Sequence, residues 1–165
     1  MKIGTIIGFL VVIAIVGGLW WQGRALDSVQ PSVAATPGTF GVMGEASRDF
    51  GRIKMKEGVV TTDFLIKNNS QQVLTLKEIY TSCMCTEATI TTATGQKRGL
   101  FGMPGHGLVP DPDLTLAPGE EATVTAFFDP AAHGPAGVGP VDREIILTTT
   151  DGQKLRLGFT GLVTP

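Results

Sequence analysis

From residue 49 onward, short apolar-polar runs alternate with turn-forming residues, and this period of two constrains the fold more than any other feature. In the last run, Leu155, Leu157 and Phe159 alternate with Arg156 and Thr160. Successive side chains of a strand point to opposite faces, so such a run has one buried face and one solvated face. About seven runs of this kind, without helical periodicity between them, predict an all-β fold. We expect an Ig-like antiparallel β-sandwich of about seven strands.

Turn signals separate the runs. Asp151-Gly152 is typical of a hairpin, and Ala117-Pro118-Gly119-Glu120 suits a type II turn. Asn68-Asn69-Ser70 is predicted as a turn; it also matches a glycosylation sequon, but both residue types are ordinary in turns. The Gly-rich segment from Ala93 to Asp113 shows no sustained pattern and is predicted as a long loop.

The beginning of the chain predicts the compartment. Residues 3–21 contain no charged residue and are long enough to cross a bilayer as a helix, with Trp20 and Trp21 at the interface. We therefore expect a single-pass membrane anchor over residues 1–24, a flexible linker over 25–44 and the β-sandwich over 45–165, outside the cytoplasm in the periplasm or at the cell surface. A signal peptide cleaved near Val33-Ala34-Ala35 is the alternative, but this site lies far from the apolar run.

Charge and motif content argue against two classes of function. From residue 45 onward there are 11 basic and 14 acidic residues with no basic cluster, so nucleic acid is not an expected partner. The chain has two histidines, His106 and His133, and neither a nucleophile elbow nor a phosphate-binding Gly-Lys motif. We therefore expect a protein that is not an enzyme, although either histidine could pair with a cysteine.

An ordered set of short motifs resembles a widespread bacterial family of exported Ig-like domains of unknown function, related to Hydin-like domains. The motifs are Asp49-Phe50-Gly51, Gly58-Val59-Val60, Lys67-Asn68, Leu74-Thr75-Leu76, Thr81-Ser82-Cys83-Met84-Cys85-Thr86, Ala117-Pro118-Gly119-Glu120, Phe128-Asp129-Pro130 and Thr149-Thr150-Asp151. The family usually has Cys-Gly-Cys-Thr where this chain has Cys83-Met84-Cys85-Thr86. The resemblance implies an Ig-like fold and an extracytoplasmic location, and it brings no established activity.

Both cysteines of the chain, Cys83 and Cys85, directly follow a strand pattern that ends at Tyr80. If the strand continued, both thiols would lie on one face with Met84 on the other, about 6.5 to 7 Å apart at Cα, which is the outer limit for a disulfide. A turn or bulge would bring them closer. Three interpretations remain open: a structural or disulfide-bonded pair, a soft-metal site, and a redox or nucleophilic thiol.

The metal interpretation adds residues from the predicted loop. Met103 and His106 lie three residues apart in a Gly/Pro context, and thiolate, thioether and imidazole together suit copper(I), less so zinc. The candidate ligands are therefore Cys83, Cys85, Met103 and His106, with Met84 and His133 as possible contributors. The competing interpretation is a solvated loop with an incidental Met and His.

The expected function is a membrane-anchored extracytoplasmic binding or assembly module that meets a protein partner at its sheet edges or long loops. The alternative is a copper(I)-binding protein that uses the Cys-Met-Cys segment and the Met/His loop.

Overall fold

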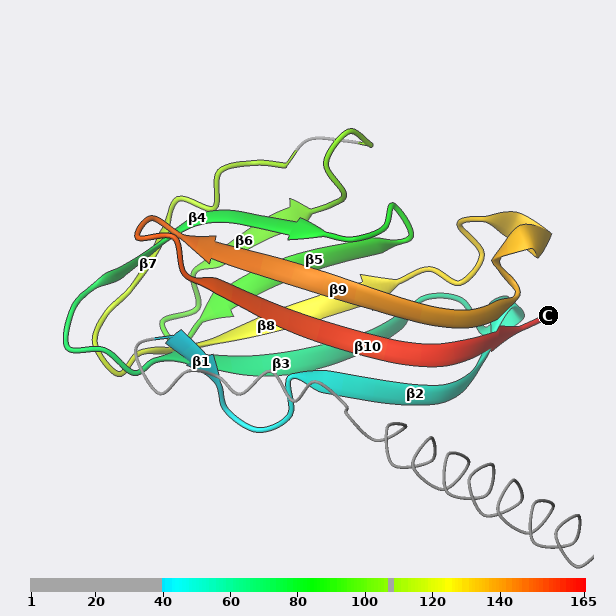
Figure 1. Cartoon of the computed structure of the whole chain (residues 1–165), viewed down its shortest axis with the longest axis horizontal. Coiled ribbons are helices and arrows are strands. Elements are labelled where there is room, and N and C mark those ends of the chain that lie inside the picture. Colours follow the sequence, from blue (N-terminus) through cyan, green and yellow to red (C-terminus); the bar gives the residue numbers. More distant parts are fainter. Residues whose placement is uncertain (1–39, 107–108) are drawn as a thin grey trace, which may run out of the picture. The chain divides into compact units, whose positions relative to one another are not determined.

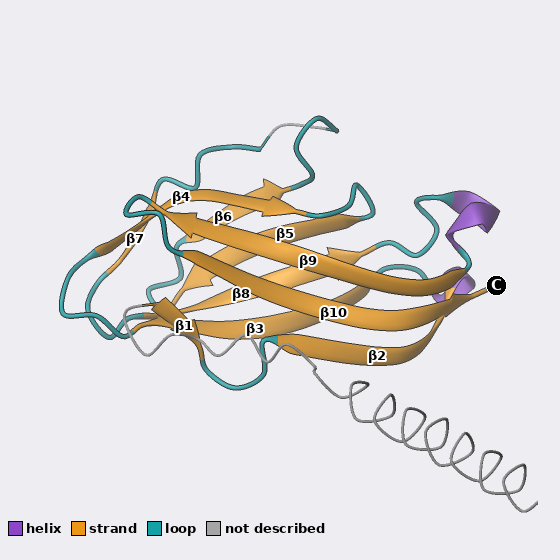
Figure 2. Cartoon of the chain, viewed as in Figure 1, coloured by secondary structure: helices purple, strands orange, loops and turns teal. Residues whose placement is uncertain are grey.

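The computed structural model describes residues 40–106 and 109–165, which form two five-stranded sheets (Figures 1 and 2). The first sheet has the order β1 (Phe40–Val42), β3 (Val60–Asn68), β8 (Glu121–Phe128), β5 (Thr86–Thr92) and β6 (Lys97–Phe101). The second has the order β2 (Ser47–Lys54), β10 (Lys154–Thr164), β9 (Gly139–Thr149), β4 (Leu74–Thr81) and β7 (Leu114–Leu116). Two short 3-10 turns, η2 (Met55–Glu57) and η3 (Gly134–Gly137), complete the described secondary structure.

The all-β prediction is confirmed, and the strand number is corrected from about seven to ten within the described residues. The additional strands are short edge strands, which carry little periodicity. β6 lies within the segment 93–113 that was predicted as a loop, and only Phe101 of its five residues is buried. β1 lies within the predicted linker 25–44; it pairs with the end of β3, and its Phe40 is buried.

One strand pair departs from the expected antiparallel arrangement. β2 runs parallel to β10, with Ser47 opposite Gly158 and Lys54 opposite Thr164. β1 belongs to the first sheet and β2 to the second, so the chain changes sheets between Val42 and Ser47. This crossing brings the first long strand beside the last strand, and the local pattern of β2 does not encode its direction.

The buried faces of the two sheets meet in one core. The alternation predicted for β10 is confirmed, and β3 and β8 follow the same period of two. The buried positions of these strands include Phe64, Ile66, Val124, Ala126, Phe128, Leu155, Leu157 and Phe159. β4 and β9 contribute Leu76, Ile79, Ile145 and Leu147, which are at most 1% exposed. Burial of this apolar surface is the main stabilising term for the fold.

Asn68 closes one end of the sandwich. Its side-chain nitrogen donates to the carbonyl oxygens of Gln72, Leu116 and Ala117 at 2.8, 2.9 and 3.1 Å. Its side-chain oxygen accepts from the backbone N–H and the hydroxyl of Ser70 at 3.0 and 2.7 Å. The residue is fully buried. The turn prediction is thereby given a physical basis, and the sequon's asparagine is inaccessible to glycosylation in the folded domain.

The predicted anchor over residues 1–24 lies outside the described residues, as does most of the predicted linker. Within residues 40–106 and 109–165, no helix is long and apolar enough to cross a membrane.

Candidate functional site

Cys83 and Cys85 lie in a turn between β4 and β5. β4 ends at Thr81, and the N–H of Thr86 donates to the carbonyl of Cys83 at 3.0 Å, which closes the turn. The Cα atoms are 5.2 Å apart, and the two sulfurs form a disulfide. The extended strand considered for this segment is therefore not formed. Because of the turn, the Cα separation is shorter than in an extended strand and lies within the range that disulfides span.

The disulfide closes a loop of only three residues. In the chain-entropy model such a loop contributes about 1.5 kcal/mol, roughly half the contribution of a 15-residue loop. The extensive core between the sheets contributes far more. Stabilisation of the fold is therefore a weak explanation for this disulfide.

Backbone and hydroxyl groups hold the cysteine turn in place. The buried hydroxyl of Thr81 donates to the carbonyls of Cys83 and Thr86 at 3.1 and 2.8 Å. The N–H of Ser82 donates to the carbonyl of Glu144, and the N–H of Glu144 donates to the hydroxyl of Ser82, both at 2.9 Å. The turn is thus fixed to β9.

Thr81→Val is expected to lower the free energy of unfolding by about 1–3 kcal/mol, because two carbonyls lose their donor in a buried position. Thr148→Val is the matched control: the Thr148 hydroxyl is buried and has no hydrogen-bond partner among the described residues. Removing it is expected to be neutral or to stabilise by about 1 kcal/mol. Urea unfolding of both variants tests the pair, and equal losses in both would contradict the assigned role of Thr81.

The environment of Cys85 is buried and positively charged. Cys85 is 3% exposed, and the Nε of Arg143 donates to its Sγ at 3.3 Å. Arg143 lies near the start of β9, opposite Phe159 of β10, and its Nη1 also donates to the carbonyl of Asp142 at 2.8 Å. No carboxylate in the described part of the chain forms an ion pair with Arg143. Among the described residues, its charge is therefore not neutralised by a carboxylate, and Nε contacts the sulfur.

The environment of Cys83 is more open. Cys83 is half-buried, and the exposed ring of His133 places Nε2 3.3 Å from its Sγ. The connection from β8 to β9 carries His133. The N–H of Asp129 donates to the carbonyl of Cys85 at 2.9 Å, which ties the start of this connection to the cysteine turn. A side chain at Gly137 would meet the Cβ of His133 at 3.3 Å, so glycine there leaves room for the histidine.

The ligand atoms of Cys83, Cys85 and His133 all lie within 4.8 Å of one another. His106 does not join this group; it is exposed, and its N–H donates to the carbonyl of Met103 at 3.1 Å. Met103 follows Gly102, whose carbonyl accepts from the N–H of Thr81 at 3.1 Å, so its segment starts beside the cysteine turn.

Met84 is 49% exposed. The side chains of His133 and Arg143 contact the two sulfurs, whereas Met84, Met103 and His106 are not among the residues in contact with them. The sequence pattern indicated His133 only as a possible contributor and gave no indication of Arg143. The available signal was Asp129-Pro130, which ends the strand at Phe128 and places the following connection at this end of the sheet.

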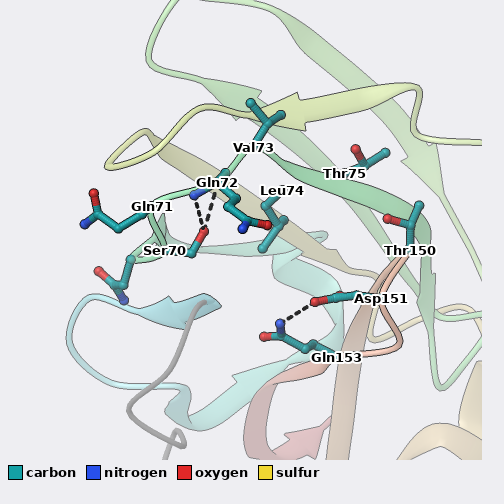
Figure 3. A pocket seen from close by; sticks show the side chains of 10 residues that line it. Ser70, Gln71, Gln72, Val73, Leu74, Thr75, Thr150, Asp151 and Gln153 are labelled. Carbon is teal, nitrogen blue, oxygen red and sulfur yellow. Dashed lines mark hydrogen bonds between the residues drawn. The ribbon is translucent and has the colours of Figure 1, made fainter.

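A hollow lies at the other end of β4, away from the cysteine turn. It is an open depression between the β3–β4 and β9–β10 connections, lined by Asn69, Ser70, Gln71, Gln72, Val73, Leu74, Thr75, Thr150, Asp151 and Gln153 (Figure 3). A hydrogen bond from the Thr149 side chain, with a smaller contribution from the Gln153 side chain, lowers the pKa of Asp151, so this carboxylate is ionised at neutral pH. The lining is polar, and its hydrogen bonds are mainly local ones, such as those of Ser70 with Gln72 and of Gln153 with Asp151.

Residues 42–99 match a family described as "Protein of unknown function (DUF1573)". The matched segment contains the cysteine turn and ends before His133 and Arg143. It confirms the expectation of a family of unknown function for this part of the chain; the relation to Hydin-like domains stays a prediction. No curated protein matches the chain.

Solved structures match the chain at low sequence identity. A protein of unknown function from Porphyromonas gingivalis W83 is 13% identical with a TM-score of 0.53; the match covers 81% of this chain and 51% of that one. This chain thus spans about half the length of that protein. The ASH/PapD-like domain of human CEP192 is 12% identical with a TM-score of 0.44, covering 76% and 85%. The periplasmic chaperone SfaE is 12% identical with a TM-score of 0.39, covering 76% and 58%. At 13% identity, the first similarity indicates a shared fold and nothing about activity.

Proposed function

We propose that this protein is an extracytoplasmic Ig-like binding or assembly module, held at the membrane by residues 1–24, that contacts its protein partner with the cysteine end of the sandwich. The observation that carries this proposal is the convergence of three connections at that end. Strand register places Thr86 opposite Phe128 and Ala88 opposite Phe101, so the β4–β5, β6–β7 and β8–β9 connections start there together (Figure 1). Loops on a rigid scaffold are the usual location of binding residues.

The sheet edges are less suitable as contact surfaces than the loops. β2 is the longest edge strand and carries Arg48, Asp49, Arg52 and Lys54. Charged side chains on an edge strand oppose pairing with another chain. At the cysteine end, by contrast, Met84 and Val138 are exposed apolar residues, at 49% and 45%. Apolar side chains on otherwise polar loops are suited to a protein contact.

Site-specific photocrosslinking in native membranes tests this contact surface. A photoreactive residue at position 84 or 138 is expected to form one discrete adduct with the same partner. Position 73 is the matched control, because Val73 is 63% exposed and lies at the opposite end of β4. Adducts from position 73 alone, or none from 84 and 138, would contradict the proposal.

The membrane anchor requires a separate test. The full chain is expected to remain in the membrane fraction after alkaline washing, and an enzyme reporter that is active only outside the cytoplasm is expected to be active when fused after Pro165. A mature protein starting near residue 36 would support the signal-peptide alternative. A cytoplasmic reporter would overturn the extracytoplasmic location.

A second candidate function is copper(I) binding, and one observation favours it: two sulfurs and an imidazole converge within 4.8 Å. Once the disulfide is reduced, Cys83 and Cys85 would supply thiolates and His133 its Nε2. Soft sulfur ligands select copper(I), whereas structural zinc sites take four protein ligands. The geometry therefore suggests His133 in place of His106. Met103 is kept as a proposed further ligand only because its segment begins beside the cysteine turn.

Anaerobic titration of the reduced full-length protein in detergent, against a chromophoric copper(I) chelator, tests this candidate. We expect one copper(I) per chain and loss of binding in the Cys83→Ser/Cys85→Ser variant. His133→Ala is expected to weaken binding by about tenfold or more, while His106→Ala is the matched control and leaves it unchanged. The reverse pattern would restore the ligand set with His106, and no tight binding would remove the metal hypothesis.

A further inference from the structure

The two sulfurs of the disulfide differ sharply in access. Cys85 is 3% exposed and belongs to the core, whereas Cys83 is half-buried at the surface of the turn. Thiol–disulfide exchange requires a thiolate to reach one sulfur along the S–S bond. A thiol arriving from solvent can approach Cys83, while protein atoms cover Cys85.

The two sulfurs also differ in their suitability as a leaving group. The guanidinium of Arg143 donates to the Cys85 Sγ at 3.3 Å and carries a permanent positive charge. A thiolate forming on Cys85 would be paired with this charge as it appears, which favours departure of that sulfur. Cys83 instead contacts the His133 ring, and among the described residues the guanidinium hydrogen bond of Arg143 goes to Cys85 and not to Cys83.

We propose that Cys83–Cys85 is a reversible redox pair that exchanges with external dithiols at one of its two sulfurs. The external thiolate attacks Cys83, and Cys85 leaves as a thiolate paired with Arg143. This goes beyond the proposed partner binding and does not depend on copper. Where copper(I) also binds, the exchange would determine when the two thiolates are available.

The exchange balances in two steps. The thiolate of an external dithiol attacks the Cys83 sulfur; a bond forms between them, the Cys83–Cys85 bond breaks, and its electron pair remains on Cys85. The second thiol of the reductant then loses its proton to solvent and attacks the first sulfur of the reductant, which is bonded to Cys83. This bond to Cys83 breaks, and the released Cys83 thiolate takes a proton from water. The reductant leaves as a disulfide, oxidised by two electrons, and the protein is reduced by two electrons.

The site of attack is tested with the wild-type full-length protein in detergent. Glutathione is the probe, the reaction is quenched early with N-ethylmaleimide, and the peptides are analysed by mass spectrometry. We expect glutathione on Cys83 and maleimide on Cys85 in about a tenfold excess over the reverse labelling. An equal distribution, or glutathione mainly on Cys85, would overturn the proposal.

Single-cysteine variants exclude transfer of the glutathione group from one cysteine to the other before the quench. With oxidised glutathione as the probe, Cys83 in the Cys85→Ser variant is expected to react about tenfold faster than Cys85 in the Cys83→Ser variant, because the low exposure of Cys85 outweighs the stabilisation of its thiolate by Arg143. Equal rates, or a faster reaction of Cys85, would contradict the difference in access.

The role of Arg143, which contacts the leaving sulfur, is tested by the rate of reduction with dithiothreitol. Arg143→Gln is expected to slow reduction about tenfold, and Arg143→Lys to recover part of the rate, because the charge is retained. Arg156→Gln is the matched control, since Arg156 pairs with Glu144 on the same sheet and does not contact the sulfurs. A wild-type rate for Arg143→Gln would remove Arg143 from the mechanism. These rates are measured without a partner protein, so a negative crosslinking result at positions 84 and 138 would contradict the proposed partner contact and not the redox proposal.

Discussion

Replacement of Asn68 by aspartate is expected to lower the free energy of unfolding by about 3–5 kcal/mol at neutral pH, because it leaves an uncompensated charge in a buried position. The change is nearly isosteric, so packing is preserved. In the native protein the side-chain nitrogen donates to three carbonyls, of Gln72, Leu116 and Ala117. In the variant a carboxylate oxygen would face these carbonyls without a proton to donate.

Asn69→Asp is the matched control, because the neighbouring asparagine is exposed and the chemical change is the same. Its effect is expected to stay within about 0.5 kcal/mol. Urea unfolding monitored by circular dichroism measures both variants. The buried carboxyl resists ionisation, so its folded-state pKa lies above the unfolded value, and the loss in Asn68→Asp should diminish at acidic pH. Similar losses in both variants would show that Asn68 does not tie the three segments together.

Much of the framework was predictable because it rests on local periodicity. In β10, Leu155, Leu157 and Phe159 are buried because alternate side chains of a strand lie on the same face. The period of two in the sequence is sufficient to predict this face. Short edge strands such as β1 and β6 contain too few residues to show a period. Their pairing is determined by neighbours that are distant in sequence, β3 for β1 and β5 for β6.

The candidate site was predictable only in part. The two cysteines marked the candidate site in the sequence, but the choice between a strand and a turn at this segment was left open. His133 and Arg143 reach the sulfurs because β8 lies beside β5 and β9 beside β4, and such register is set by the assembled sheets. His106 was the more conspicuous histidine in sequence because of its spacing from Met103. The group at the sulfurs instead contains a residue 50 positions from Cys83 and another 58 positions from Cys85.

Replacement of Phe159 by alanine is expected to cost about 3–5 kcal/mol of unfolding free energy, the range for truncating a buried aromatic residue. Phe159 is fully buried, and its ring lies 5.4 Å from the ring centroids of both Phe50 and Phe128. Phe128 belongs to the first sheet, and the other two rings to the second. The substitution therefore removes both the packing between the sheets and two aromatic contacts, each worth about 0.5–1.5 kcal/mol.

Leu162→Ala is the matched control, because Leu162 lies on the same strand and is 41% exposed. Its loss is expected to remain below about 1 kcal/mol. Phe159 is also the strand partner of Arg143, so loosening of the core here should reach the sulfur that Arg143 contacts. We therefore expect Phe159→Leu, which retains most of the packing, to stay folded and to be reduced by dithiothreitol at a rate different from wild type, while Leu162→Ala is reduced at the wild-type rate. A small stability loss in Phe159→Ala would mean that the sheets are held together elsewhere, and unchanged reduction in Phe159→Leu would mean that the position of Arg143 is set by β9 alone.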